Sequence, residues 1–560
     1  MRLTNTLQNY RRDWLGADLT AGLIVAILIT PQAIAYAMLA GMPPQAGLYA
    51  ALLPVIVYAL LGTSPVLAVG PVAIISLMTF EALQPLASPG SSEYMALAAG
   101  LALLTGLWLL LFFLIDLGRW TNFISHSVIS AFTSAAAILI VLSQIRHVTG
   151  LPIPSDGPLW QPIQTMLSAS DQLRPDVLLL FALALLLLLS WQKGMPRLTR
   201  RLPQWLASLL NKAAPLVLVI AGIAAVSGLA LPVKVVGELP AGLPALQLPW
   251  LTWPQWQSLL PSAAVIALIG YLESLAVAQS LADRRGPKLH SNQELLALGG
   301  ANLVAAFSQA FPVAGGFGRS VVNHAAGAKT QLASIITALL VAIICLFAAR
   351  LFMNLPNAVL AVIIVVAVWP LIRFADGWQA WRYQKSDGLV WLMTFAGVLL
   401  GGAESGILLG MLLSLVLFLK RTSEPHIAEI GRVGNSDHFR NIRRHQVGTS
   451  PTVLMIRIDE NLYFANSHFL QETIANSLQQ RPAVQHVVLV GSAINHIDYI
   501  GLETLQHLLQ DLRERGVQLH LAEFKGLVMD RLQRTDLLPQ LAPGRIFFTA
   551  SEALRELGQC

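Results

Sequence analysis

Charged residues are scarce in this chain, and cysteine is nearly absent. Asp, Glu, Lys and Arg make up 12% of the 560 residues, whereas a soluble globular domain carries about a quarter. With 55% hydrophobic residues and a mean hydropathy of +0.63, the chain is too apolar to be water-soluble throughout. The two cysteines, Cys345 and Cys560, offer neither a disulfide framework nor the spacing of a metal site.

Motifs for catalysis are also lacking. The sequence contains no P-loop, so we expect no ATP-driven transport by this chain alone, and it contains no nucleophile elbow. We therefore expect no catalytic residues, no cofactor, no bound metal and no enzyme activity. The formal net charge of +6 is interpreted as membrane topology and not as nucleic-acid binding.

What the sequence has instead is a series of long hydrophobic segments. Residues 16 to 420 contain about fourteen of them, and runs such as "LALLTGLWLLLFFLI" are typical of membrane-spanning helices, which require roughly 20 apolar residues. The pattern predicts an α-helical polytopic membrane protein embedded in a lipid bilayer. The approximate segment centres are Val25, Leu53, Ile75, Leu104, Ile138, Leu185, Val219, Ile269, Val304, Val321, Leu339, Ile364, Leu392 and Leu412.

The distribution of Arg and Lys predicts the topology. One expected cytoplasmic connection, residues 193 to 212, contains five basic residues and no acidic one. The expected outer connections hold only Arg146, Arg174, Lys234 and Arg350. Because basic residues accumulate on the cytoplasmic side of a membrane, we expect an even number of spans with both termini in the cytoplasm.

Fourteen spans divide into two halves of seven, which must have opposite orientations. In inverted repeats of this kind, discontinuous helices meet at the bilayer midplane. The third span of each half, near Ile75 and Val321, begins with a stretch that contains glycine, "AVGPVA" and "GGFGRS" respectively. We expect both spans to be half-helices.

The pattern changes after Arg421. Residues 1–421 form the predicted transmembrane domain, and residues 422–449 are polar and basic, which predicts a linker. In residues 450–560, strand-like runs such as "TVLMIRI" and "HVVLVG" alternate with helical runs such as "GLETLQHLLQDLRERG". This alternation predicts a small soluble α/β domain.

The segment "FPVAGGFGRSVVN", residues 311–323, places a glycine cluster and Arg319 between apolar segments. A buried charge in a membrane span is costly, so it marks a functional site with a partner. If a half-helix begins at Phe317 or Gly318, its free N–H groups and positive dipole end add to the guanidinium charge. An opposing helix end near Pro71 and Val72 would complete an anion site. The alternatives are that Arg319 reaches the membrane interface or only pairs with an acid.

Glu273, in "VIALIGYLESLAVAQSLA", is a second charge amid apolar residues. Such a carboxyl group can carry a proton or help to bind Na⁺, and so couple a cation to anion movement. A structural ion pair with Arg319 is the alternative, and the two roles can coexist. In the first span, Gln32 and Tyr36 share one helix face, where they either line a ligand site or pack against another helix.

Several longer stretches resemble one known family. They are "TPQAIAYAMLAGMPPQAGLYAALLPVIVYALLGTSP", "VGPVAIISLM", "GYLESLAVAQSLA" and "NLPNAVLAVIIVVAV", together with the glycine–arginine segment. The chain resembles the sulfate permease family of anion transporters, which carry a C-terminal STAS domain, nearly from end to end. Of the family signature P-x-Y-G-L-Y with a G-T-S-basic close, this chain has "PQAGLY" and "GTSP", without the first tyrosine and the final basic residue.

The resemblance implies fourteen spans in two inverted seven-helix repeats, divided into a core and a gate domain, and a cytoplasmic STAS domain. It also implies a homodimer and an elevator-like movement of the core. Many relatives have serines where this chain has Gly316 and Gly318, so backbone N–H groups are expected to contact the anion instead. The implied proton-coupling acid is Glu273, and the implied anion pocket consists of Gln32, Tyr36, Val72, Ala73, Phe317, Gly318, Arg319 and Ser320.

The expected function is secondary active transport of an inorganic anion across a bacterial inner membrane, with sulfate–proton symport as the leading case. Sodium-dependent bicarbonate transport is the closest alternative, and C4-dicarboxylates come third. A membrane scaffold or sensor and an uncoupled anion channel are alternatives of other classes. The stretch Asp498-Tyr499-Ile500-Gly501 lacks the phosphorylatable serine of anti-sigma-factor antagonists. We therefore expect the STAS domain to stabilise a dimer or to dock a cytoplasmic protein partner.

Overall fold

The protein is described from a computed structural model. The described residues are 10–119, 125–151, 161–168, 172–203, 206–207, 210–211, 213–229, 231–282 and 289–558. Lys212, at the end of the predicted basic connection, and Cys560 lie outside these ranges. The chain divides into two compact units, Met1–Leu412 and Leu413–Cys560.

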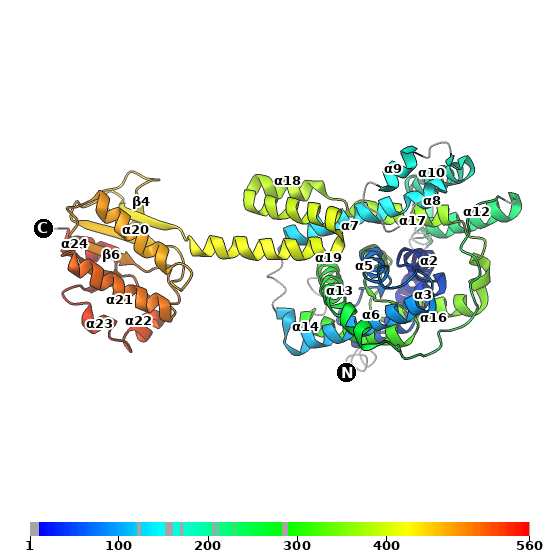
Figure 1. The fold of residues 1–560 in the computed structure, drawn as a ribbon, viewed down its shortest axis with the longest axis horizontal. Coiled ribbons are helices and arrows are strands. Elements are labelled where there is room, and N and C mark those ends of the chain that lie inside the picture. The colour runs from blue at the N-terminus through cyan, green and yellow to red at the C-terminus, as the bar shows by residue number, and fades with distance from the viewer. Residues whose placement is uncertain are drawn as a thin grey trace. The chain divides into compact units, whose positions relative to one another are not determined.

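The first unit is built from helices, and all fourteen predicted segment centres lie in them (Figure 1). Within the described ranges, nine helical stretches are long and apolar enough to cross a membrane. The helices are α2 (Leu15–Leu39), α3 (Pro44–Ala50), α4 (Leu53–Leu61), α5 (Ala73–Leu83), α6 (Ser92–Leu114), α7 (His126–Ser143), α8 (Ile145–Thr149), α9 (Gln161–Ser168), α10 (Pro175–Leu198), α12 (Ala214–Leu229), α13 (Trp253–Ser280), α14 (Ser291–Phe307), α15 (Phe317–Ala325), α16 (Leu332–Ile343), α17 (Asn357–Val368), α18 (Phe374–Tyr383) and α19 (Lys385–Ser423).

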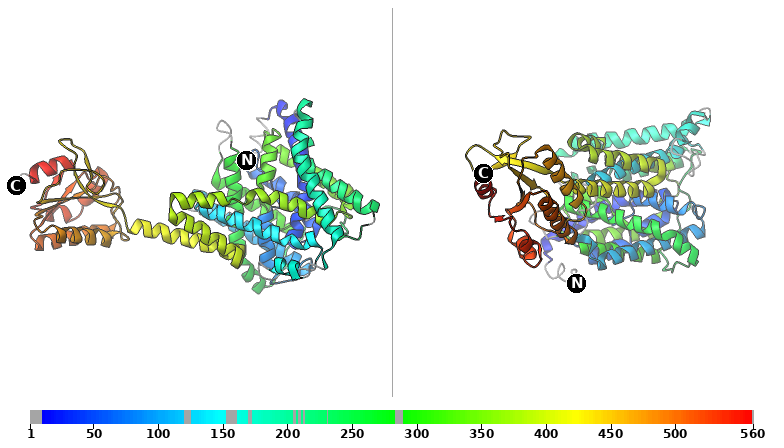
Figure 2. Two further views of the ribbon diagram at one scale, coloured as in Figure 1. Left: turned by 90° about the horizontal axis from the view of Figure 1, so that it is seen from above. Right: turned by 60° about the vertical axis from the view of Figure 1, so that its left-hand side comes forward.

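These helices pack as two groups. In one group α6 packs against α13 and α14, α14 packs against α4, and α16 packs against α2. In the other group α10 packs against α8, α12 and α17, and α7 packs against α17 and α18 (Figures 1 and 2). The groups meet where α2 contacts α12 and α17 and where α5 contacts α7. This arrangement separates a core from a gate.

Two short strands cross in the middle of the first unit. Strand β1 (Val69–Gly70) pairs antiparallel with β2 (Ala314–Gly315), with Val69 opposite Gly315 and Gly70 opposite Ala314. Each strand leads into a short helix, α5 or α15, which is the third predicted span of its half. The antiparallel crossing of two equivalent segments is the arrangement expected of inverted repeats.

The last two predicted spans are the two halves of α19, which is broken at Gly402 with φ 86°. Its halves lie close together, because a Cβ atom at Gly406 would lie 2.2 Å from the backbone nitrogen of Val398. The second half is capped from the core, since the backbone N–H of Ala403 donates to Oε2 of Glu81 at 2.9 Å. Glycine adopts a positive φ readily, so Gly402 allows the chain to turn back between the two halves of α19.

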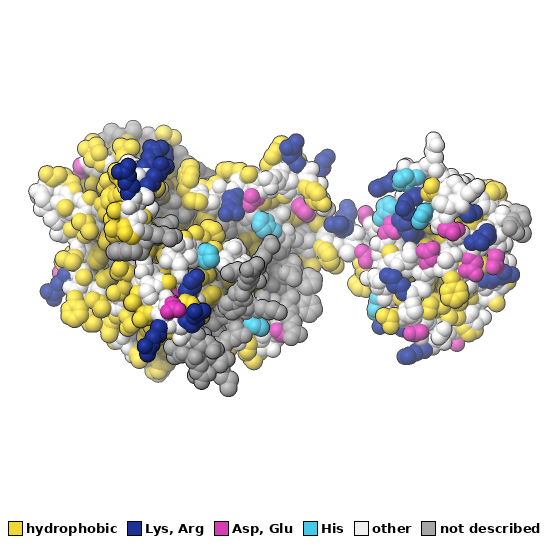
Figure 3. Space-filling view, turned by 180° about the vertical axis from the view of Figure 1, so that it is seen from behind, with side chains coloured by type: hydrophobic (Ala, Val, Ile, Leu, Met, Phe, Trp, Pro, Cys, Tyr) yellow, Lys and Arg dark blue, Asp and Glu magenta, His cyan; other side chains and the backbone are white. Residues whose placement is uncertain are grey.

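The surfaces of the two units differ in chemistry. On the face that Figure 3 shows, apolar side chains cover much of the first unit, whereas charged side chains of both signs are spread over the C-terminal unit. The first unit exposes large apolar residues such as Leu186, Phe347 and Leu400. Exposure of this kind fits a surface that faces lipid hydrocarbon.

The C-terminal unit is an α/β domain with a six-stranded sheet in the order β4-β3-β5-β6-β7-β8. Strands β5 to β8 are parallel, and β3 and β4 extend the sheet as antiparallel strands. Apolar side chains are buried on both faces of the sheet. The elements are β3 (Ile427–Arg432), β4 (Phe439–Asn441), β5 (Val453–Ile458), α20 (Ser467–Gln480), β6 (His486–Val490), α21 (Tyr499–Glu514), β7 (Gln518–Ala522), α22 (Gly526–Leu532), α23 (Leu537–Gln540), β8 (Ile546–Phe547) and α24 (Ala550–Leu557).

The expectation that residues 422–449 form a linker is wrong for much of that range. Helix α19 continues to Ser423, and β3 and β4 belong to the sheet. The physical reason is the alternation at the start of β3, where Ala428 and Ile430 are buried while Ile427 and Glu429 are partly exposed. The alternating run is short and lies among basic residues, so the sequence indicated a linker where the structure has a half-buried strand.

A pair of histidines lies inside the C-terminal sheet. His520 is 1% exposed, its Nδ1 accepts a hydrogen bond from the backbone N–H of Arg545 at 3.0 Å, and its Nε2 lies 3.2 Å from Nδ1 of His486. Burial, with the nearby charges of His486 and Arg545, lowers the pKa of His520 to about 4. The neutral imidazole is therefore part of the folded state.

We predict that this unit loses stability as the pH falls from 7 toward 5. An unfolded His520 with a pKa near 6.5 binds a proton in this range whereas the folded one does not, which costs about 2 kcal/mol of unfolding free energy. Urea unfolding of residues 424–560 measures the loss, and His520→Gln should flatten it. The control His468→Gln, at a side chain 90% exposed, should keep the wild-type pH dependence, and an unchanged slope in His520→Gln would contradict the assignment.

Candidate anion-binding site

The strand crossing brings two helix N-termini together. Helix α5 begins at Ala73 after Val72, and α15 begins at Phe317 after Gly316. Neither N-terminus is capped by a side chain in the described part of the chain. The N–H groups of a first helical turn have no intrahelical partner, and the helix dipole makes that end positive. Two such ends are therefore available to a negatively charged ligand.

Arg319 connects the two helix ends. Its side chain is 2% exposed, and its Nη1 donates to the carbonyl oxygen of Pro71 at 2.6 Å. Its Nε and Nη2 are buried and have no hydrogen-bond partner among the described residues. Unpaired buried donors on a cation are costly, so an anion placed beside them would stabilise the arrangement.

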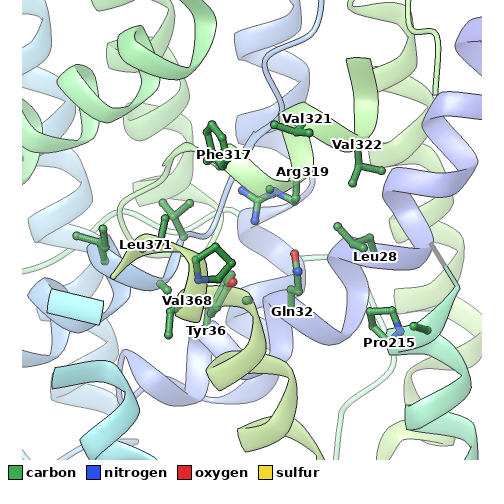
Figure 4. A pocket seen from close by; sticks show the side chains of 18 of the residues that line it. Leu28, Gln32, Tyr36, Pro215, Phe317, Arg319, Val321, Val322, Val368 and Leu371 are labelled. Carbon is green, nitrogen blue, oxygen red and sulfur yellow. The ribbon is translucent and has the colours of Figure 1, made fainter. Parts of the chain in front are cut away.

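A cavity of about 640 Å³ lies beside these helix ends. Figure 4 shows Arg319 and Phe317 from α15 with Gln32 and Tyr36 from α2 around this space, and the wall formed by Val368 and Leu371. Seven of the eight predicted pocket residues line the cavity, and Glu273 lines it as well. The seven are Gln32, Tyr36, Val72, Ala73, Phe317, Gly318 and Arg319.

Ser320 is the predicted pocket residue that the structure places elsewhere. Its Oγ donates to the carbonyl oxygen of Gly316 at 2.7 Å and accepts from the backbone N–H of Ala68 at 2.9 Å. The next position along a helix points about 100° away, so Arg319 faces the cavity whereas Ser320 faces the strand crossing. Ser320 therefore connects α15 to Ala68, the residue before β1, and does not line the pocket.

The glycines of the segment have two different roles. A Cβ atom at Gly316 would lie 2.8 Å from Cζ and Nη2 of Arg319, so only glycine leaves room for the guanidinium. At Gly318 a Cβ atom would meet nothing within 4 Å. Gly316 is thus required for the position of Arg319, whereas Gly318 borders open space.

Glu273 extends from α13 into the same cavity, and its Oε2 is buried without a hydrogen-bond partner among the described residues. Neither a hydrogen bond nor an ion pair within the described ranges joins it to Arg319. The predicted alternative of a structural pair is therefore absent from this conformation. The residue after Glu273 holds the backbone of β2 in place, because Oγ of Ser274 accepts a hydrogen bond from the N–H of Gly315 at 2.7 Å.

Several residues that shape the site escaped the sequence analysis. Asn302 holds the segment before β2 by exchanging two hydrogen bonds with the backbone of Val313, at 2.9 and 3.0 Å. Gln192 and Asn211 line the cavity from the gate side. The signal for Asn302 was a lone amide in the apolar run "GGANLVAAF", whereas Gln192 lies in an ordinary polar helix end.

Comparison with known proteins agrees with this architecture. The family model described as Sulfate permease family matches residues 15–394, and the STAS domain model matches residues 445–553. Sulfate transporter 4.1, chloroplastic, of Arabidopsis thaliana is 34% identical over 526 residues, which cover 92% of this chain and 76% of that protein. A probable sulfate transporter of Mycobacterium tuberculosis is 31% identical over 553 residues, which cover 98% of this chain and 96% of that protein.

A solved structure supports the fold independently. The murine Solute Carrier 26 family member A9 anion transporter, in an inward-facing state, superposes with a TM-score of 0.89 at 23% sequence identity, covering 99% of this chain and 93% of that one. At this identity the likeness concerns the fold. The family match over most of the membrane unit and the two relatives show that the chain belongs to the sulfate permease family, a family of anion transporters and not of enzymes.

Proposed function

We propose that this protein is a secondary active transporter that moves sulfate together with protons. The observation that carries the proposal is the pair of unpartnered guanidinium nitrogens of Arg319 between two uncapped helix N-termini. The names of the two relatives, both sulfate transporters, favour sulfate among small anions.

The charge of the site favours a dianion. Each helix end contributes roughly half a positive charge, so the two ends and Arg319 supply roughly +2 when Glu273 is protonated. An ionised Glu273 lowers this sum to roughly +1, which suits a monovalent anion such as bicarbonate. Uptake of a proton at Glu273 therefore favours sulfate, and this linkage is the proposed basis of coupling.

The same sum of charges also bears on how the core moves when sulfate is bound. With sulfate bound and Glu273 protonated, the charges of the core site nearly cancel. The wall opposite the site is largely apolar and includes Ala367, Val368 and Leu371. Moving an uncompensated charge past such a wall is costly, so protonation of Glu273 lowers the cost of moving the sulfate-loaded core along the gate. This is an elevator-type movement of the group that contains α2, α5, α13 and α15.

We further propose that this conformation faces the cytoplasm. The cavity extends to Gln192 and Pro196 at the C-terminal end of α10 and to Asn211 beyond it. That end of α10 carries Arg197, followed by Arg200, in the connection predicted to be cytoplasmic. Anions released from Arg319 would leave past these basic residues.

Replacement of Arg319 by alanine should strongly reduce sulfate uptake. In proteoliposomes with an inward proton gradient, [³⁵S]sulfate uptake by the wild type is expected to fall at least about tenfold in Arg319→Ala, because loss of one charged contact costs about 1.5–3 kcal/mol. Equal uptake by the wild type and Arg319→Ala would mean that Arg319 has only a structural role. A wild type that takes up bicarbonate with Na⁺ but no sulfate would contradict the substrate assignment. If the wild type transports neither anion, the alternative that the protein is a membrane sensor would be favoured.

Gly316 and Gly318 form a matched pair of variants. Gly316→Ala places a methyl group 2.8 Å from the guanidinium carbon and should displace Arg319, reducing sulfate uptake about tenfold or more, whereas Gly318→Ala meets nothing within 4 Å and should stay within about twofold of the wild type. The KM and maximal rate of [³⁵S]sulfate uptake measure both. If the two variants behave alike, the close approach of Gly316 to Arg319 does not position the anion site.

Replacement of Glu273 by glutamine should uncouple sulfate from protons. Glutamine resembles the protonated carboxyl group, so the variant is expected to exchange sulfate for sulfate across the membrane at equal concentrations. It should not accumulate sulfate when only a proton gradient is applied. Accumulation in Glu273→Gln that remains fully dependent on the proton gradient would place the coupling group elsewhere.

A further inference from the structure

A second, smaller pocket lies on the same seam between α2 and α17 as the main cavity. The main cavity is bordered by Tyr36 of α2 and Val368 of α17, and the smaller pocket by Met38 of α2 and Leu360 of α17. The polar lining of the smaller pocket consists of Gln144, Arg146, His147 and Asn357. Its volume is about 10 Å³, which is room for about one water molecule.

The two pockets lie toward opposite ends of α10. The main cavity reaches Gln192 and Pro196 near the C-terminus of that helix. The short helix α8, which carries Arg146 and His147, packs against α10, and the backbone N–H of Arg174, just before α10, donates to the carbonyl oxygen of Thr149 at 3.2 Å. A helix of 24 residues is about 36 Å long. The smaller pocket is therefore on the side of the membrane away from the mouth of the main cavity.

Arg146 is a partly buried cation that has no counter-charge among the described residues. Its Nε donates to Nε2 of His147 at 3.2 Å, and no carboxylate in the described part of the chain forms an ion pair with it. A second basic residue is close, because the backbone N–H of Asn357 donates to the carbonyl oxygen of Lys234 at 3.0 Å and the charge of Lys234 acts on His147. Removing an unpaired charge from water is costly, and a transient anion would offset that cost.

The other groups of the pocket can also serve an anion. Asn357 is the first residue of α17, so it lies at a positive helix end. Its Oδ1 is buried without a partner among the described residues, and rotation of the amide would present Nδ2 as a donor instead. Arg146, the amide of Asn357 and the start of α17 thus converge on one closed space.

We propose that this pocket is an outer capture site for the transported oxyanion. Arg146 and Asn357 bind the anion from the outer solution when the seam between α2 and α17 opens, and the anion then passes along the seam to Arg319. In the present conformation the seam is closed at the smaller pocket, near Arg146, and open at the main cavity, near Gln192. The inference rests on the proposed anion transport and adds a second binding step to it.

The test separates capture from a structural role of Arg146. Cells without sulfate uptake of their own, producing the full chain, expose only the outer face, and initial rates of [³⁵S]sulfate uptake give KM and maximal rate. Arg146→Gln is expected to raise KM about tenfold with the maximal rate within about twofold, because charge is lost at the capture step and not at the transport step. Arg146→Lys should restore most of the affinity. The matched control Arg350→Gln, at an exposed arginine also predicted on the outer side, should leave both constants unchanged.

The possible results are distinct. An Arg146→Gln variant with a lower maximal rate and an unchanged KM would mean that Arg146 only holds α8 in place, and the proposal would be wrong. If that variant fails to reach the membrane, Lys234→Gln, at an exposed side chain, should raise KM twofold to threefold, and an unchanged KM there would equally overturn the capture site. Absence of uptake by the wild type would instead contradict the proposed function.

Discussion

The antiparallel crossing of β1 and β2 is the constraint on which the rest of the structure depends. By pairing Val69 with Gly315 and Gly70 with Ala314, it places the starts of α5 and α15 on either side of one space. Arg319 spans that space through its hydrogen bond to Pro71. The buried side chains of Ser274, Asn302 and Ser320 serve the crossing, since each binds the backbone of a segment next to it. Their hydrogen bonds satisfy loop backbone that hydrocarbon could not solvate.

This arrangement explains how an anion site can be built with few polar side chains. The charge comes from two helix ends and one arginine, and Gly316 provides space for the guanidinium. In the proposed site the donors to the anion are backbone N–H groups, so the site needs no hydroxyl groups at Gly316 and Gly318. On the proposed function, the selectivity for the anion depends on the net charge of the site, which protonation of Glu273 would change.

The sequence predicted the features that have a strong local pattern. Long apolar runs located all fourteen segment centres, and seven of the eight pocket residues that the family resemblance implied line one cavity. It did not predict the direction of Ser320, because that depends on the hydrogen bonds of its hydroxyl group to the backbone of Gly316 and Ala68. The cap that Glu81 provides to Ala403 and the gate residue Gln192 were also missed, since both depend on contacts between distant helices. Strand β3 was taken for a linker because its apolar alternation is short.

The central claim is that the anion binds between the two helix ends beside Arg319. A cryo-electron microscopy map of the protein in lipid nanodiscs with saturating sulfate tests it most directly. The account predicts a compact density within hydrogen-bonding distance of the Arg319 guanidinium and of the first N–H groups of α5 and α15. A sulfate density elsewhere in the cavity, away from both helix ends, would contradict it.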